Sequence, residues 1–444
     1  MQTNKQPFHF FSIVTLIAKW ALVIFIIAIS TGSAVALFLW LLQKVTEIRW
    51  NNPSLLYLLP AAGVIIYLVY TFWGKNSDKG NNLLIDEIHQ PGGGVPKRMA
   101  PLVLAATIIT HLFGGSAGRE GTAVQMGGSI AGALSNWFKL NTPNTQLALM
   151  AGIAAGFGAV FGTPVTGTIF AMEVLAIGHL QYKAIMPCLA AAVVGDITCT
   201  AWGIRHTIYH INFTADKAQT WFTYLHVDLY VLGKVALAGV LFGLCSTLFA
   251  QTAHRLKATF KKLVPTAWLV PVIGGLIIIA LTYISGTTDY LGLGVSSNNP
   301  GAFTLVSAFH AGGAGTWSWL WKLLFTTITL SSGFKGGEVT PLFFIGAALG
   351  NTLAIVSGAP VDLFAGLGFI AVFAGATNTP LACTIMGVEL FGGEHILYYA
   401  IACFLAYFFS GHSGIYSSQR IAVPKIMQAF FTHTFSKRGS GKSD

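Results

Sequence analysis

Residues 114–128 read GGSAGREGTAVQMGG and place one arginine and one carboxylate among glycines. Between residues 99 and 137, Arg119 and Glu120 are the only Lys, Arg, Asp or Glu side chains. A charged side chain at the centre of a membrane helix costs roughly 2.5–3.5 kcal/mol on insertion scales, and such residues usually mark an ion or proton pathway. Glu120 is therefore the first candidate for chemistry in this chain.

The glycines around this pair predict a break in the backbone. Residues 123–137 form an apolar run directly after them, so a helix would begin here with its free backbone N–H groups aimed at one spot. Helix N-termini of this kind bind anions, because the N–H groups and the helix dipole both favour negative charge. The stretch thus combines a buried carboxylate with a predicted anion site.

The composition is that of a polytopic membrane protein. Of the 444 residues, 54% are hydrophobic and 9% are charged, and the mean hydropathy is +0.67. Soluble domains carry roughly 25% charged residues. Several apolar runs are shorter than the ~20 residues that a spanning helix needs, and many are interrupted by glycine, which occurs 50 times. Such segments predict an all-α fold with discontinuous helices around a site at the membrane midplane.

The net charge of +10 is better explained by membrane orientation than by a nucleic-acid partner. Basic residues gather at 254–262 (HRLKATFKK) and at 437–442, and cytoplasmic loops of membrane proteins carry an excess of Lys and Arg. Lys5, before the first apolar run, agrees with a cytoplasmic N-terminus. We therefore expect residues 1–444 to form one transmembrane transport domain with short cytoplasmic N- and C-terminal tails.

The two halves of the chain resemble each other. An offset of 216 aligns the Thr-Pro pair 163–164 with the pair 379–380 and Glu173 with Glu389, and an offset of 219 aligns Gly118 with Gly337. Weak internal similarity is typical of a two-repeat transporter, whose binding site lies where the repeats meet. The alternative is a chance alignment of glycine- and alanine-rich helices. Because two separate motif pairs agree in order, we expect repeats at about residues 55–204 and 228–420.

Four ordered motifs are similar to those of the CLC family of chloride channels and anion/proton antiporters. GREGT (118–122) resembles the family's GREGP, whose glutamate is the external gate, and residues 159–173 resemble the helix that follows it. GEVTP (337–341) stands where the family has GxFxP, and Tyr416 stands where a tyrosine reaches the central anion. The resemblance covers residues 10–423. It implies two inverted-topology repeats and a homodimer in the bacterial cytoplasmic (inner) membrane.

Three departures from the common pattern resemble the bacterial fluoride/proton antiporter subclass of this family. Thr122 replaces a proline, Val339 replaces a phenylalanine, and GNNLL replaces GSGIP, which puts Asn81 at the serine position. PGGGVP is a rival for that motif, with Gly93 at the serine position. We prefer Asn81 because it stands 39 residues before Glu120, close to the family's spacing, whereas Gly93 stands 27 residues before it.

The resemblance makes Glu120 the proton carrier and external gate. Its carboxylate would occupy the anion site and leave when it is protonated or displaced by an anion. The alternative is a structural ion pair with Arg119, which is itself interpreted as structural. The backbone of the two motifs is formed by Gly118, Gly121, Thr122 and Gly337.

Four groups are predicted to bind the anion: the amide of Asn81, a backbone N–H at Val339, the hydroxyl of Thr340 and the phenol of Tyr416. A small anion that gives up strongly held water needs close, charge-assisted donors in return. Each group has an alternative role. Asn81 can cap the helix that starts near Leu83, Val339 and Thr340 can simply begin a helix, and tyrosines in membrane proteins are common interface anchors.

Three further features leave alternatives open. Phe343 and Phe344 could turn their positive ring edges toward a fluoride, although core packing is the other use for two of 32 phenylalanines. Lys335 and Glu338 are interpreted as a local ion pair or as a field at the cytoplasmic mouth. Glu173 is not followed by the second glutamate that some exchangers use for internal proton transfer.

These features predict a secondary active transporter that exchanges cytoplasmic fluoride for external protons. A chloride/proton antiporter or a chloride channel of the same family is the alternative. We do not expect an enzyme, and the HExxH motif is absent. The histidines show no metal spacing, and the five cysteines lack CxxC spacing and are interpreted as packing residues. No metal or cofactor is expected, and the predicted partners are fluoride or chloride, protons and the lipid bilayer.

Overall fold

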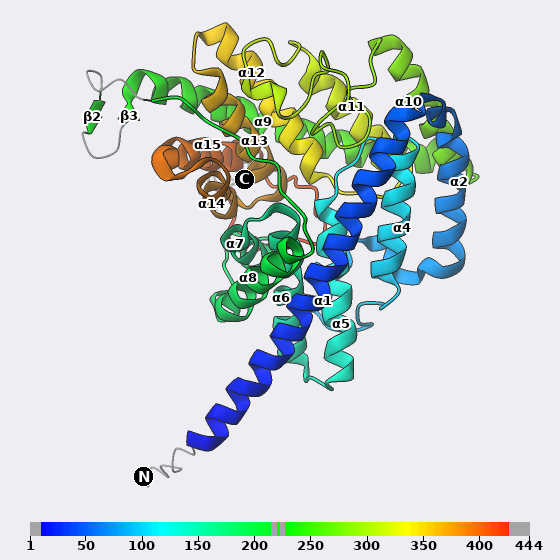
Figure 1. Ribbon diagram of the computed structural model, residues 1–444, viewed down its shortest axis with the longest axis vertical. Helices are drawn as coiled ribbons and strands as arrows, with labels where there is room; N and C mark the ends of the chain where they lie inside the picture. Colours follow the sequence, from blue (N-terminus) through cyan, green and yellow to red (C-terminus); the bar gives the residue numbers. More distant parts are fainter. Residues whose placement is uncertain (1–9, 215–219, 223–226, 426–444) are drawn as a thin grey trace, which may run out of the picture.

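The computed structural model describes residues 10–214, 220–222 and 227–425, with the backbone alone for 10–17 and 220–222, and shows a bundle of helices of very different lengths (Figure 1). In the first half of the chain the α-helices are α1 (Phe10–Asn51), α2 (Leu59–Val69), α3 (Asn81–His89), α4 (Met99–Leu112), α5 (Glu120–Trp137), α6 (Thr142–Phe161), α7 (Pro164–Glu173) and α8 (Ile185–Ala201). In the second half they are α9 (Leu229–Leu263), α10 (Leu269–Ser285), α11 (Ser318–Ser331), α12 (Val339–Ser357), α13 (Val361–Thr377), α14 (Pro380–Phe391) and α15 (Ile396–Phe409).

Short turns and strand pairs connect these helices. The 3₁₀ or π turns are η1 (Pro53–Leu58), η2 (Tyr70–Gly74), η3 (Lys75–Lys79), η4 (Tyr182–Ala184), η5 (Ser307–Phe309) and η6 (Gly393–His395). Strand β1 (Ala176–Ile177) pairs in parallel with β4 (Arg420–Ile421), and β2 (Thr220–Phe222) pairs antiparallel with β3 (Val227–Asp228). Both pairs are too short to form a sheet layer, and the all-α prediction is confirmed.

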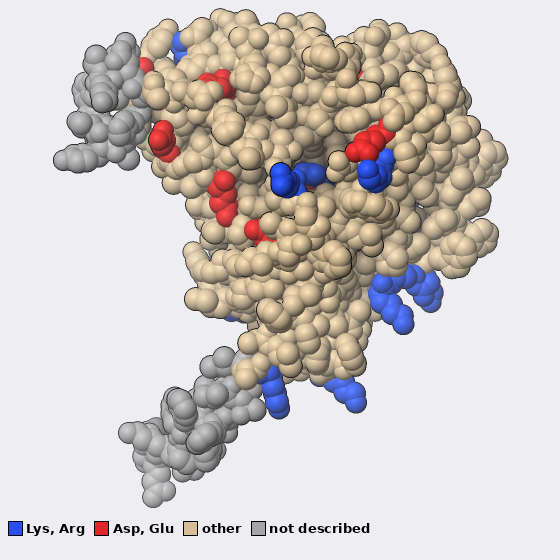
Figure 2. Space-filling model, viewed as in Figure 1, with Lys and Arg blue, Asp and Glu red and all other residues tan. Residues whose placement is uncertain are grey.

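Several of the helices can cross a membrane. Within the described residues, six helical stretches are long and apolar enough to span one: Ala18–Asn51, Pro53–Lys79, Thr142–Phe161, Tyr182–Ala201, Leu229–Leu263 and Val339–Ser357. Figure 2 shows a face with few charges, on which Lys and Arg gather at the lower edge, where α1 starts and α5 ends in Figure 1. By the positive-inside rule we expect that edge to be cytoplasmic. The tails predicted on this side lie outside the described residues.

Helices α4 to α8 recur in the same order as α11 to α15. The breaks before α7 and α14 are built alike. Gly162 directly follows α6 and Asn378 directly follows α13, and both residues are in the left-handed conformation. Glycine and asparagine are the residues that tolerate this conformation best. Pro164 and Pro380 then begin α7 and α14, where a fixed φ and a missing N–H are both tolerated.

A reciprocal contact ties α7 to α14. The carboxylate of Glu173, the last residue of α7, accepts the backbone N–H groups of Leu381 at 3.1 Å and Ala382 at 2.8 Å, in the first turn of α14. Near the end of α14, Glu389 does the same at the start of α7 and accepts two backbone N–H groups at 2.9 and 2.8 Å. The two equivalent helices therefore run in opposite directions, as inverted repeats require. The repeat boundaries stay a prediction.

The contact assigns Glu173 a structural role that can be tested. We expect Glu173→Ala to lower the free energy of unfolding by about 1–2 kcal/mol, because it leaves the first N–H groups of α14 without an acceptor. Thermal unfolding in detergent measures this change. Glu394→Ala removes an exposed carboxylate and serves as the control. A parent-like melting temperature for Glu173→Ala would contradict this account of the cap.

Candidate anion and proton site

The N-termini of α5 and α12 meet at a pair of glycines. The backbone N–H of Gly118 donates to the carbonyl of Gly337 at 2.6 Å, and the N–H of Gly337 donates to the carbonyl of Gly118 at 2.9 Å. The approach leaves no room for a side chain, since a Cβ on Gly337 would lie 2.7 Å from the backbone nitrogen of Gly121. The two motifs that an offset of 219 aligns are thus in direct contact, and two positive helix ends converge there.

Glu120 lies at this point and is bound by both helices. It is the first residue of α5 and is 1% exposed. One carboxylate oxygen, Oε2, accepts the backbone N–H of Arg119 at 3.1 Å and that of Thr340 at 3.0 Å. The other oxygen, Oε1, accepts the hydroxyl of Thr340. The carboxylate therefore takes up the donors that the start of α12 would offer to an anion.

The side chain of Arg119 lies beside this carboxylate without a hydrogen bond to it. Its Nε is 3.4 Å from Oε1 of Glu120, within ion-pair distance, but it has no hydrogen-bond partner among the described residues. The ion pair that the sequence left as an alternative is thus present geometrically. It coexists with the bonds from Thr340, so it does not by itself fix the position of Glu120.

Asn81, Tyr416 and Glu338 line one cavity of about 210 Å³. We call this cavity the inner vestibule, because residues of the basic end of α9, predicted to be cytoplasmic, also line it. Asn81 begins α3, and its Nδ2 lies 3.3 Å from where a Cβ on Gly121 would be. The predicted anion ligands Asn81 and Tyr416 are therefore brought to the inner side of the Glu120 position.

Gly93, the rival candidate for the serine position, lies outside the inner vestibule. Its backbone N–H, like that of Gly92, donates to the carboxylate of Glu87 at 3.0 Å. The loop 91–96 thus closes on the end of α3 and does not line the inner vestibule, whereas Asn81 does. In the sequence, only the distance to Glu120 along the chain distinguished Asn81 from Gly93.

The other motif residues have local structural roles. Thr122 shares a hydrogen bond of 2.8 Å with the hydroxyl of Thr107, which links α5 to α4. Val339 begins α12 and is 1% exposed, but the backbone N–H that reaches Glu120 belongs to Thr340. The bound conformation thus uses both donors of Thr340.

Phe343 and Phe344, the two candidate aromatic contacts, lie in different surroundings. Phe343 stacks on Phe369 with ring centroids 3.9 Å apart and lines a small chamber together with Glu120. Phe344 instead packs edge to face against Tyr290 and lies under the ammonium group of Lys322, whose Nζ is 5.6 Å from the ring centroid. Of the two, only Phe343 is next to the carboxylate.

Glu120 also lines a small chamber, together with residues that the sequence did not predict. It has a volume of about 20 Å³. We call it the outer chamber because segment 294–305 lines both it and a cavity at the end of α1, away from the edge where α1 starts. Besides Glu120 and Thr340 its polar lining is Arg119, His206, Thr207 and Tyr209, and its apolar lining is Phe161, Val295, Leu305, Phe343, Phe369 and Leu390. His206 and its neighbours belong to the polar segment after α8, which in the sequence served only to divide the halves.

The expected ion pair between Lys335 and Glu338 is wrong. Lys335 pairs instead with Asp78, 257 residues earlier in the chain, and its Nζ lies 4.4 Å above the ring centroid of Tyr70. Glu338 is thereby left facing the inner vestibule, where a Cβ on Gly121 would be 3.7 Å from its Oε2.

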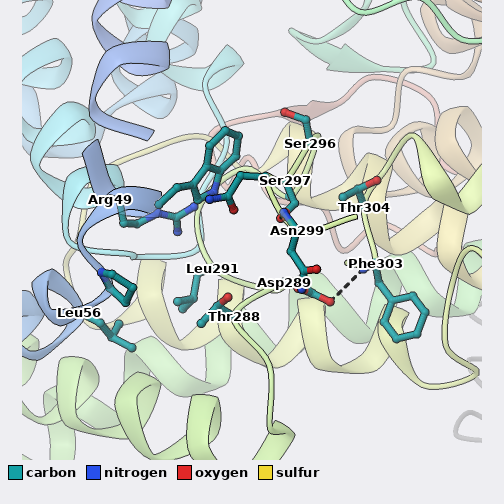
Figure 3. Close-up of a pocket in the computed structure, with 14 residues that line it drawn as sticks. Arg49, Leu56, Thr288, Asp289, Leu291, Ser296, Ser297, Asn299, Phe303 and Thr304 are labelled. Carbon is teal, nitrogen blue, oxygen red and sulfur yellow. Dashed lines mark hydrogen bonds between the residues drawn. The ribbon is translucent and has the colours of Figure 1, made fainter. Parts of the chain in front are cut away.

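A second cavity, of about 220 Å³, lies at the end of α1 and is separate from this site (Figure 3). Arg49 and Asp289 line it from opposite walls, and Asp289 accepts the backbone N–H of Phe303 at 2.9 Å. Segment 294–305 contributes residues to this cavity and to the outer chamber, so it forms the wall between them. None of the predicted site residues lines the cavity in Figure 3.

Comparison with known proteins identifies the family. Residues 61–411 match a family model described as voltage gated chloride channel. This chain belongs to the CLC family. The resemblance inferred from four short motifs is confirmed, and the match covers both helix N-termini that meet at Glu120.

Individual CLC proteins are similar over nearly the whole chain. A chloride/fluoride channel protein of Pseudomonas syringae pv. tomato is 46% identical over 92% of this chain and 88% of its own length. The crystal structure of a CLC-type fluoride/proton antiporter superposes with a TM-score of 0.84 at 34% identity, over 91% of this chain and 98% of the other. A slow cyanobacterial Cl⁻/H⁺ antiporter, with a TM-score of 0.73 and 18% identity, over 95% and 99% of the two chains, shares the fold.

The glycine contact predicts that this CLC site tolerates no side chain at Gly337. We expect Gly337→Ala to reduce anion flux on the order of tenfold or more, because its Cβ would push α12 away from Gly121 and the donors of Thr340 away from Glu120. Flux is measured in proteoliposomes. Gly233→Ala, in α9 with open space around its Cβ, is the control. Equal flux for Gly337→Ala and the parent would count against the close contact.

Proposed function

We propose that this CLC protein exchanges fluoride for protons across the membrane. The observation that carries the proposal is the position of Glu120, whose carboxylate accepts both the N–H and the hydroxyl of Thr340 at the start of α12. Those donors are the ones a small anion would use at the same helix end. The carboxylate and an anion thus compete for one place, and protonation of the carboxylate decides which of them holds it.

The anion preference is proposed from the ligands on the inner side. Asn81 offers amide N–H groups at the inner vestibule and Tyr416 offers a phenol there. Fluoride holds its water strongly, so it exchanges that water only for close, well-directed donors. The similar Pseudomonas protein is described with both chloride and fluoride, and the similar solved structure is described as a fluoride/proton antiporter.

Protons need a group on the inner side as well. Glu173 does not supply one, because both of its oxygens accept backbone N–H groups of α14. Glu338 lines the inner vestibule beside Asn81 and directly precedes α12. We assign it as the carboxylate that exchanges protons with the cytoplasmic solution, which places one acidic side chain on each side of the shared site.

The direction of transport follows from the driving forces. Moving one charge across the membrane potential is worth ~2.3 kcal/mol per 100 mV, so inward protons and outward fluoride are both driven by an interior-negative potential. The protein would thus expel fluoride. We place it in the bacterial inner membrane as a homodimer with one pore per subunit, with residues 1–444 as one transport domain whose repeats cover about 55–204 and 228–420.

Proton coupling is tested with a substitution at Glu120. We expect Glu120→Gln to abolish proton movement and to slow fluoride efflux on the order of tenfold or more, because the amide keeps the shape of the side chain but cannot carry a proton. Efflux from fluoride-loaded proteoliposomes is followed with an ion-selective electrode while external pH is recorded. Proton uptake that persists in the variant would remove Glu120 from the proton path, and anion flux without proton movement in the parent would make this a channel.

Anion selectivity is tested at Asn81. We expect Asn81→Ser to lower fluoride flux relative to chloride flux by about tenfold, because the amide N–H donors at the mouth of the site are lost while a small polar side chain is kept at the first residue of α3. Paired efflux assays with fluoride or chloride inside measure the ratio. Asn136→Ser, at an exposed asparagine near the end of α5, is the matched control. If chloride flux equals fluoride flux in the parent, the result favours the alternative hypothesis of a chloride/proton antiporter.

A further inference from the structure

The outer chamber is the right size for one water molecule. Its volume is about 20 Å³, and a single water needs roughly 10–15 Å³ of such space and two to four polar partners. Glu120, Thr340 and His206 all line it. One water there would be within reach of the gating carboxylate on one side and of an imidazole on the other.

His206 is held at this chamber by packing on a glycine. It belongs to the segment after α8, and its ring lies against Gly162, the left-handed residue that directly follows α6. A Cβ on Gly162 would be 2.6 Å from Cδ2 of His206, so the glycine serves both the helix end and the ring. The ring is thus positioned by the backbone and does not simply fill space.

The polar atoms of His206 are not satisfied by the described protein. Both ring nitrogens, Nδ1 and Nε2, are buried without a hydrogen-bond partner among the described residues. Leaving buried polar atoms unpaired costs about 1–3 kcal/mol each, so a site beside a water-sized chamber is where a bridging water is expected. The carboxylate of Asp196 in α8 lies beyond hydrogen-bond distance, with its Oδ1 3.8 Å from Nε2.

Burial and the nearby charge of Arg119 keep the ring neutral. Arg119 faces it from the start of α5, Asp196 faces it from α8, and Glu120 shares the chamber. Burial, and then the charge of Arg119, lower the pKa of His206 to about 4. The ring is therefore neutral above that pH, with one nitrogen that donates and one that accepts, which is the form that can pass a proton on.

We propose that His206 and one water in the outer chamber form the outer proton-binding site, which carries protons between the external solution and Glu120. A proton from the external solution binds the bare nitrogen of the ring and forms the imidazolium. That nitrogen then releases the proton to the chamber water, and the water gives one of its own protons to the Glu120 carboxylate. The ring is left in the tautomer in which it started. This inference rests on the proposed fluoride/proton exchange.

The test is the external pH dependence of coupled exchange. Fluoride efflux and proton uptake are measured in proteoliposomes between external pH 5 and pH 8 for the parent, His206→Gln, and His210→Gln as control, an exposed histidine of the same segment. We expect His206→Gln to be slower by about tenfold at pH 8 and to approach the parent at pH 5, where solvent protons are abundant. His210→Gln should follow the parent at every pH.

A second variant separates a proton relay from a purely structural role. In His206→Ala the space of the ring is left open, and external imidazole should restore proton-coupled efflux at pH 8, because it can supply the missing group. No rescue, or pH profiles for both His206 variants that coincide with the parent's, would overturn the assignment of His206. The parent is measured before the variants. If it moves fluoride without protons, the proposed fluoride/proton exchange is wrong, whatever the His206 variants do.

Discussion

Two helix N-termini that point at each other require negative charge between them, and the rest of this structure depends on that constraint. The tips of α5 and α12 are joined by the paired hydrogen bonds of Gly118 and Gly337, so neither helix can turn its free N–H groups elsewhere. In a bilayer no solvent would satisfy them. The carboxylate of Glu120 fills this role in the described conformation, and an anion would fill it in another.

The same chemistry occurs a second time in a form that stays fixed. Glu173 and Glu389 also place carboxylates on helix N-termini, each on the partner helix of the other repeat. There each carboxylate binds two successive N–H groups with both oxygens. Separating α7 from α14 would break all of these bonds, so we expect the contact to stay closed. Glu120 differs because it is bound by Thr340 and Arg119 beside two cavities, so another anion or a water can replace its contacts.

The sequence was sufficient wherever a short motif carried the chemistry. Glu120 could be predicted because a lone carboxylate among apolar residues is costly, and Gly118 could be matched to Gly337 because the repeat preserves the spacing. Contacts between distant segments could not be predicted in this way. Lys335 pairs with Asp78 across 257 residues, and no local pattern indicates it. His206 likewise lies in a polar connection whose sequence gives no sign that it lines the outer chamber.

The difference in size between the two cavities explains why protonation should control passage. The inner vestibule, at about 210 Å³, leaves room for an anion and its water beside Asn81 and Tyr416. The outer chamber, at about 20 Å³, is far smaller, and apolar side chains such as Phe161, Phe343 and Phe369 form half of its lining. If the ionised carboxylate of Glu120 moved into this chamber, it would lose its donors at Thr340 and its desolvation would cost free energy. A neutral carboxylic acid would avoid most of that cost. Anion exit and proton entry are thus coupled by the cost of moving one charge.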